Sequence, residues 1–188
     1  VEGFRDFYIA PSGRAILPVE GSPELSNLEE EVVLGPGLVL ALALGGKWSL
    51  HASAVVFRGE GLVFLGESGY GKSTLAGYLQ ATGSPDWQRA ADDILPVTVE
   101  DGRLTGWPHF PQLKLPAEQQ PGNSLPEQVG LDRVYLLAPA GPEGELGLEE
   151  LSRDEGARVL LAHTAGARLF TPELLAGTAL ARGTQLIG

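Results

Sequence analysis

The segment at residues 66–73 constrains this chain more than any other. It reads Gly66-Glu67-Ser68-Gly69-Tyr70-Gly71-Lys72-Ser73 and fits the phosphate-loop pattern G-x-x-x-x-G-K-[ST] at every fixed position. The apolar run at 62–65 before it predicts a buried strand, and residues 74–79 after it predict a helix. In this order, the backbone N–H groups of a glycine-rich loop and the positive end of a helix dipole point at one place. The segment therefore predicts a site for the phosphates of a nucleotide.

The residue types within the loop assign separate tasks. Glycine permits positive φ and a close approach of the backbone to a ligand. Lys72 supplies a cation for the β- and γ-phosphates, and the Ser73 hydroxyl is placed to reach a bound Mg²⁺. The predicted cofactors are therefore ATP and Mg²⁺, with the choice between ATP and GTP left open. The residues expected to bind the nucleotide are Gly66, Glu67, Ser68, Gly69, Tyr70, Gly71, Lys72, Ser73 and Thr74.

Composition limits the class of protein. With 188 residues, 43% of them hydrophobic, the chain can bury one sizeable core. We expect a small β-rich segment with a buried helix over residues 1–46 and a kinase-like domain over 47–188. A net charge of −11 disfavours nucleic acid and anionic membranes as partners. The lack of cysteine excludes disulfides and thiolate sites and fits a cytoplasmic protein. The longest apolar run, at 38–44, is far shorter than the roughly 20 residues of a membrane span.

The N-terminal segment predicts a hairpin and a helix. Apolar residues at 4–9 and 15–19 flank a turn signal at 11–14 and predict two paired strands. Residues 21–31 are polar and are expected to form a solvated loop or surface. Residues 38–44, which follow Gly-Pro-Gly and precede Gly-Gly, predict a helix. Because this helix is apolar all round, we expect it in the core.

A hairpin is also predicted directly before the phosphate loop. Residues 48–57 are rich in β-forming side chains, and the turn at 58–61 joins them to the strand at 62–65. His51 then lies at the end of its strand that faces the phosphate loop. Two interpretations stay open for His51: a hydrogen-bonded structural residue, or a neighbour of the phosphates.

Two adjacent carboxylates, Asp92 and Asp93, follow the predicted helix. A strand, a helix and a second strand form a βαβ unit with parallel strands, whose carboxyl ends meet at one edge. If the carboxylates follow the second strand, they face the phosphate loop across a cleft. One could hold Mg²⁺ while the other accepts a proton from an attacking hydroxyl. The alternative is an exposed acidic turn.

Three segments together resemble the HPr-kinase-like family. They are Leu50-His51-Ala52-Ser53-Ala54-Val55, the loop at 66–73, and Ala91-Asp92-Asp93. The resemblance implies an α/β fold related to the nucleotide-binding domain of phosphoenolpyruvate carboxykinase, and transfer of the ATP γ-phosphate to a serine hydroxyl. It also implies a base at Asp92, a metal ligand at Asp93, phosphate and metal contacts from Lys72 and Ser73, and a histidine near the phosphates at His51.

The first of these segments especially resembles a subgroup encoded beside peptide-modifying enzymes, including kinases of lasso-peptide precursors. The Glu-x-Arg-Gly-x-Gly signature of true HPr kinases is replaced here by Trp107-Pro108-His109-Phe110-Pro111-Gln112-Leu113-Lys114-Leu115. Phosphorylase activity and HPr as the substrate are therefore not implied. The replacing segment is expected to be extended, as a structural edge or as a wall of the acceptor site, with Lys114 as a candidate phosphate contact.

The remaining chain predicts a loop at 116–130 that could act as a lid, a buried strand at 134–137 and a further strand at 146–151. A capping box starting at Ser152 predicts a helix that ends near His163, and residues 173–182 predict a last helix. The function expected is a serine kinase acting on a peptide or protein. A small-molecule kinase and a nucleotide-binding switch or accessory ATPase remain as alternatives, and a homo-oligomer stays open.

Overall fold

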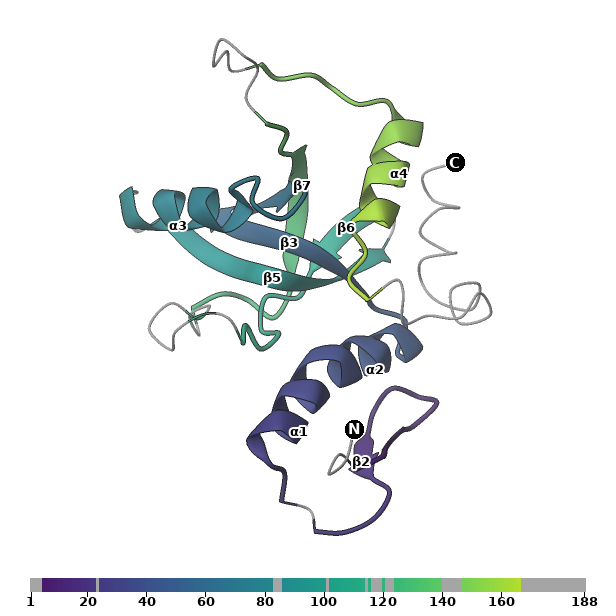
Figure 1. Cartoon of the computed structure of the whole chain (residues 1–188). Helices are drawn as coiled ribbons and strands as arrows, with labels where there is room; N and C mark the ends of the chain where they lie inside the picture. The colour runs from purple at the N-terminus through teal and green to yellow at the C-terminus, as the bar shows by residue number, and fades with distance from the viewer. Residues whose placement is uncertain are drawn as a thin grey trace.

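The computed structural model describes residues 5–22, 24–82, 86–100, 102–113, 115, 120, 124–139 and 147–166. The architecture is mixed α/β: a closed barrel of five strands with a helix on its outer face, and a separate N-terminal part of two strands and a helical rod (Figure 1). Within these ranges, no helix is both long and apolar enough to cross a membrane.

The barrel has the strand order β3-β4-β7-β6-β5. Its strands are β3 (Trp48–Phe57), β4 (Glu60–Leu65), β5 (Trp87–Glu100), β6 (Arg103–Gly106) and β7 (Val129–Leu136). The predicted hairpin before the phosphate loop is confirmed, because β3 and β4 pair antiparallel. Strand β7 runs parallel to β4, and β6 closes the barrel between β7 and β5.

Strand β3 is buried on both faces, which explains its long run of β-forming residues. Its even-numbered residues point into the barrel and join the main core, among them Leu50, Ala52 and Ala54. Its odd-numbered residues face α3 (Lys72–Thr82), where Val55 packs with Ala76. Alternate residues of a strand point to opposite faces, so the side chain of every second residue reaches the α3 side. His51 and Ser53 belong to this set.

The predicted βαβ unit is correct in direction but not in detail. Strands β4 and β5 run the same way because β3 pairs antiparallel with both, and β3 therefore lies between them. The expectation that Asp92 and Asp93 follow the second strand is wrong. Strand β5 continues through both residues for 14 positions, from Trp87 to Glu100, so the carboxylates project from its interior.

The N-terminal part forms the predicted hairpin of β1 (Phe7–Ile9) and β2 (Ile16–Pro18). It continues into a helical rod made of α1 (Asn27–Val32), the π-helical turn η1 (Val33–Gly37) and α2 (Leu38–Leu44) (Figure 1).

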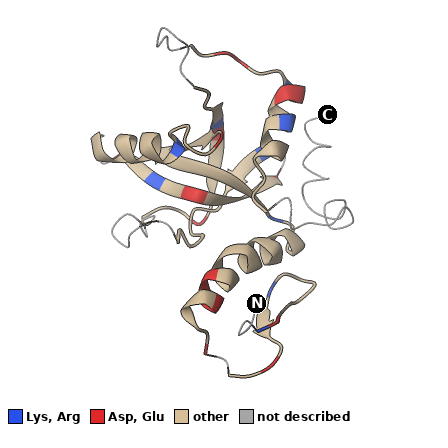
Figure 2. Ribbon diagram, in the orientation of Figure 1, with Lys and Arg blue, Asp and Glu red and all other residues tan. Residues whose placement is uncertain are grey.

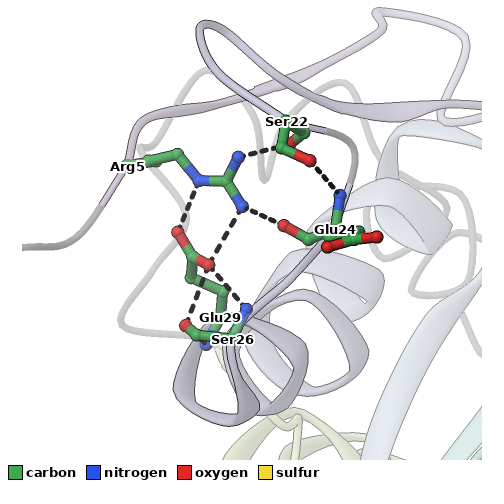
Figure 3. A network of polar contacts seen from close by, with 5 residues as sticks. All are labelled: Arg5, Ser22, Glu24, Ser26 and Glu29. Carbon is green, nitrogen blue, oxygen red and sulfur yellow. Dashed lines mark hydrogen bonds and ion pairs between the residues drawn. The ribbon is translucent and has the colours of Figure 1, made fainter.

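The expectation of a solvated loop over residues 21–31 is wrong for its second half. Ser26 and Glu29 form a capping box that starts α1. Glu29 is buried, and Arg5 compensates its charge by donating to its carboxylate at 2.7 Å (Figure 3). The predicted helix at 38–44 is present, but its place in the core is not. Only Val39, Ala41 and Ala43 of α2 are buried, and none belongs to the core inside the barrel.

The C-terminal elements agree only in part with those predicted from the sequence. Strand β7 contains residues 134–136 of the strand predicted at 134–137, but Val134 and Leu136 are exposed, so its predicted burial is wrong. No strand forms over the described residues 147–151 of the segment predicted at 146–151. Helix α4 (Arg153–Ala162) starts at the predicted capping box of Ser152. Lys114, residues 116–119 and 121–123 of the predicted lid, and the helix predicted at 173–182 lie outside the described residues.

Candidate functional site

The phosphate loop has the backbone that its sequence predicts. Gly66, Gly69 and Gly71 adopt φ values of 147°, 88° and 85°. A Cβ at Gly66 would lie 2.9 Å from the carbonyl oxygen of Leu137, so this position tolerates glycine alone. The Lys72 ammonium donates to the carbonyl oxygens of Gly66 at 2.7 Å and Glu67 at 3.1 Å. The loop thus holds its cation inward, at the start of α3.

A pocket of about 250 Å³ opens between this loop, β3 and β5. Its volume is at the small end for a small-molecule site, where about 300 Å³ is a usual lower value, and it suits a phosphate chain. It contains most of the residues predicted for the site, together with Ser53, which the sequence analysis did not single out. The lining residues are His51, Ser53, Ser68, Gly69, Gly71, Lys72, Ser73, Thr74, Asp92 and Asp93. The predicted nucleotide-binding residues Gly66, Glu67 and Tyr70 are in the loop but do not line the pocket, and Tyr70 is exposed.

Asp92 is buried and held from two sides. It lies directly opposite Ser53 in the β3–β5 register, so both side chains share the face toward α3. The Ser53 hydroxyl donates to Asp92 Oδ1 at 2.7 Å. The Asp92 backbone N–H donates to the side-chain oxygen of Gln112 at 2.8 Å. Asp92 therefore presents a fixed carboxylate to the pocket.

Asp93 reaches the same pocket through an unusual backbone conformation. Adjacent residues of a regular strand face opposite sides, and the cross-strand partner of Asp93 is Ala52, which points into the barrel. Asp93 has φ 126°, a value that side-chain-bearing residues rarely adopt and that costs about 1–3 kcal/mol. This twist allows both carboxylates to line one pocket. His51 Nδ1 lies 3.3 Å from Asp93 Oδ1, with both side chains partly exposed.

Gln112 shows what the segment at 107–115 does, although the expectation that this segment is extended is wrong: its described residues turn or bend at 108–110 and turn again at 113. The Gln112 side chain is fully buried behind β5 and donates to the carbonyl oxygens of Ile94 at 3.0 Å and Phe110 at 2.9 Å. Together with the Asp92 N–H, these bonds attach the segment to the backbone around the two carboxylates. The segment supports the site from behind. Nothing in the sequence distinguishes Gln112 as the residue that does so.

Arg89 fixes α3 to β5 beneath the loop. Its guanidinium is buried and donates to the Ser73 carbonyl oxygen at 2.8 Å, in the first turn of α3. Figure 2 shows the charges on these two elements, with acidic residues in the middle of β5 and a basic residue at the start of α3. Opposite charges therefore approach the pocket from two separate elements.

The end of α4 lies beside the first residues of β3, which β4 does not reach. His163 is the C-terminal cap of α4, as predicted, and its carbonyl oxygen accepts from the His51 N–H at 2.7 Å. The pairing of Leu50 with Thr164 continues this contact along the strand. Burial lowers the pKa of His163; Lys72 and His51 lower it further, while Glu67 opposes them. A second imidazole thus lies within electrostatic range of the phosphate loop.

Similarity to known proteins is found among solved structures. No family model matches the chain. No curated protein matches it either. Among solved structures, the chain is similar to the Hpr(Ser) kinase/phosphatase from Coxiella burnetii, with 21% identity and a TM-score of 0.39. The match covers 54% of this chain and 65% of that one, slightly less than two thirds of its length.

Proposed function

We propose that this protein is a Mg²⁺-dependent kinase that transfers the γ-phosphate of ATP to a serine hydroxyl of a peptide or protein. A ribosomally made precursor of the lasso-peptide type is the acceptor that the sequence motifs favour. One observation carries the proposal: Lys72 of a complete phosphate loop and the carboxylates of Asp92 and Asp93 line one pocket.

The residues present fit a nucleotide with its metal ion. A Cβ added at Gly69 or Gly71 would meet no atom within 4 Å, so open space adjoins the loop at both positions. Ser73 and Asp93 would hold Mg²⁺, which when bound neutralises charge between the carboxylates and the phosphates. Within the described ranges, no group of three or more His, Cys, Asp or Glu side chains could hold a metal ion. The other ligands would therefore be phosphate oxygens and water, which Mg²⁺ commonly retains.

The chain's own residues supply positioning and one proton acceptor, which is what phosphoryl transfer requires of a protein. Lys72 would leave its two carbonyl partners and bind the β- and γ-phosphates. Asp92 would accept the proton of the acceptor hydroxyl while the new O–P bond forms and the bond to the β-phosphate oxygen breaks. His51 orients the Asp93 carboxylate through the 3.3 Å contact.

The test is mass spectrometry after incubation with Mg-ATP and a panel of acceptors. The panel holds serine-containing peptides encoded near this gene, together with HPr. We expect one added phosphate on a peptide serine with the wild-type protein and none with Asp92→Asn. Asp86→Asn is a matched control, because Asp86 bonds to Arg58 outside the pocket.

Three other outcomes would contradict parts of the proposal. Phosphate transfer that survives Asp92→Asn would show that Asp92 is not the proton acceptor. Transfer to small hydroxyl compounds alone would indicate a small-molecule kinase. Tight Mg-ATP binding with no transfer at all would favour a nucleotide-binding switch.

A further inference from the structure

Ser53 makes a short polar contact with one of the two carboxylates of the pocket. Its hydroxyl lies 2.7 Å from Asp92 Oδ1, and both residues are almost fully buried. The two residues face each other across adjacent strands, so the contact is fixed by the register of β3 and β5. It does not depend on a flexible loop.

The contact makes the two oxygens of Asp92 unequal. Oδ1 accepts from Ser53, whereas the described residues give Oδ2 no donor. The backbone of Asp92 is held separately by Gln112 at 2.8 Å. With the backbone and one oxygen fixed, rotation of the carboxylate is restricted. The second oxygen is the one left to meet an incoming hydroxyl.

We propose that Ser53 is a positioning residue that holds Asp92 with Oδ2 directed at the acceptor hydroxyl. The proposal rests on the proposed function, because it assigns Asp92 the role of proton acceptor. Ser53 itself exchanges no atom with the substrate. It acts by reducing the orientations of the carboxylate to one, and correct orientation accounts for a large share of the rate in such reactions.

Ser49 provides a matched control. It is a buried serine on the same strand, four residues before Ser53 and on the same face. Among the described residues its hydroxyl has no hydrogen-bond partner. Ser49→Ala therefore removes the same atom from a similar environment without touching Asp92.

The experiment compares the wild-type protein with Ser53→Ala, Ser53→Thr and Ser49→Ala. Crystal structures of each give the orientation of the Asp92 carboxylate, and steady-state kinetics use Mg-ATP with the serine peptide that accepts phosphate. In Ser53→Ala we expect a rotated or multiply oriented carboxylate, about a tenfold lower kcat and an unchanged KM for ATP. Ser53→Thr, which keeps the hydroxyl, should restore both properties, and Ser49→Ala should change neither.

Two results would overturn the proposal. One is a single, unchanged Asp92 orientation with unchanged kcat in Ser53→Ala. The other is phosphate found on Ser53 of the wild-type protein, because its hydroxyl would then be an acceptor. A wild-type protein that modifies no acceptor would overturn the proposed function instead. The carboxylate orientation in Ser53→Ala would then decide by itself whether Ser53 positions Asp92.

Discussion

Two polar clusters in this molecule differ in how their charges are satisfied. In the N-terminal part, the Arg5 guanidinium donates to both carboxylate oxygens of Glu29, at 2.7 and 3.0 Å. It also donates to the carbonyl oxygens of Ser22 and Glu24 (Figure 3). Glu29 in turn accepts from the backbone N–H of Ser26. The Arg5 guanidinium and the Glu29 carboxylate therefore pair with each other and with neighbouring groups of the chain.

The pocket is arranged differently. Lys72 donates only to backbone carbonyl oxygens and, among the described residues, forms no ion pair. Asp93 is held in a costly backbone conformation, and its side chain contacts a histidine that need not be charged. A site that binds a charged ligand must keep some charge unneutralised until the ligand arrives. The comparison therefore separates a cluster whose two opposite charges pair with each other from a pocket whose lysine, among the described residues, forms no ion pair.

The largest expected effect is a loss of Mg-ATP affinity, which should follow a substitution in the pocket but not one in the N-terminal cluster. Replacing Lys72 with alanine removes the cation but no ion pair, so Mg-ATP affinity should fall about 100-fold while the fold is retained. Isothermal titration calorimetry measures the affinity. Arg5→Ala is the control, because it removes a cation outside the pocket and should leave Mg-ATP affinity unchanged. Equal losses of Mg-ATP affinity in Lys72→Ala and Arg5→Ala would show that the two cations do not differ in their role in nucleotide binding.

Acid should weaken the N-terminal cluster in a defined range of pH. The hydrogen bond from Arg5, followed by those from Ser26, lowers the pKa of Glu29 from 4.5 to about 2. A carboxylate with a lowered folded-state pKa stabilises fully above its ordinary pKa, and this stability is lost as pH falls toward the lowered value. The melting temperature of the wild-type protein should therefore fall more steeply between pH 4.5 and 2 than that of Glu29→Gln. Parallel curves for the two proteins would contradict the assignment.

A stability measurement tests the strain at Asp93. Because glycine adopts positive φ without cost, Asp93→Gly should raise the free energy of unfolding by about 1 kcal/mol while abolishing phosphate transfer. Urea denaturation measures the first change and mass spectrometry the second. Arg58→Gly is the control, since Arg58 has φ 52° in a turn outside the pocket and its replacement should leave transfer unchanged. Destabilisation by Asp93→Gly would mean that contacts of the carboxylate outweigh the strain.

The sequence predicts the parts of this site that depend on local pattern. The phosphate loop and the hairpin before it follow from glycine spacing and β-forming residues, and the start of α4 follows from a capping box. An equivalent capping box is present at Ser26 and Glu29, but the charge run at 29–31 favours a solvated surface in the sequence. Its partner Arg5 lies 24 residues from Glu29, and no local pattern reveals such a pairing.

The remaining features of the site depend on long-range pairing. That Asp92 and Asp93 lie inside β5 follows from the register with β3, which the sequence does not state. Ser53 could have been identified, because it lies two residues after His51 and therefore on the same strand face. Gln112 could not, since its role depends on how the segment at 107–115 packs behind β5.

The smallest expected effect concerns His163, at the end of α4. Burial lowers the pKa of His163 below its ordinary value of 6.5, so the unfolded chain binds a proton at this residue more readily than the folded one. Stability should therefore decline slightly as pH falls through 6.5, a range in which the low pKa of Glu29 leaves the N-terminal cluster intact. The urea midpoint of the wild-type protein should be lower at pH 6 than at pH 8, and His163→Gln should reduce this difference. If the urea midpoint of His163→Gln changed between pH 6 and pH 8 as much as that of the wild-type protein, the pH dependence would belong to another group. His163 would then not distinguish its region from the N-terminal cluster in this range of pH.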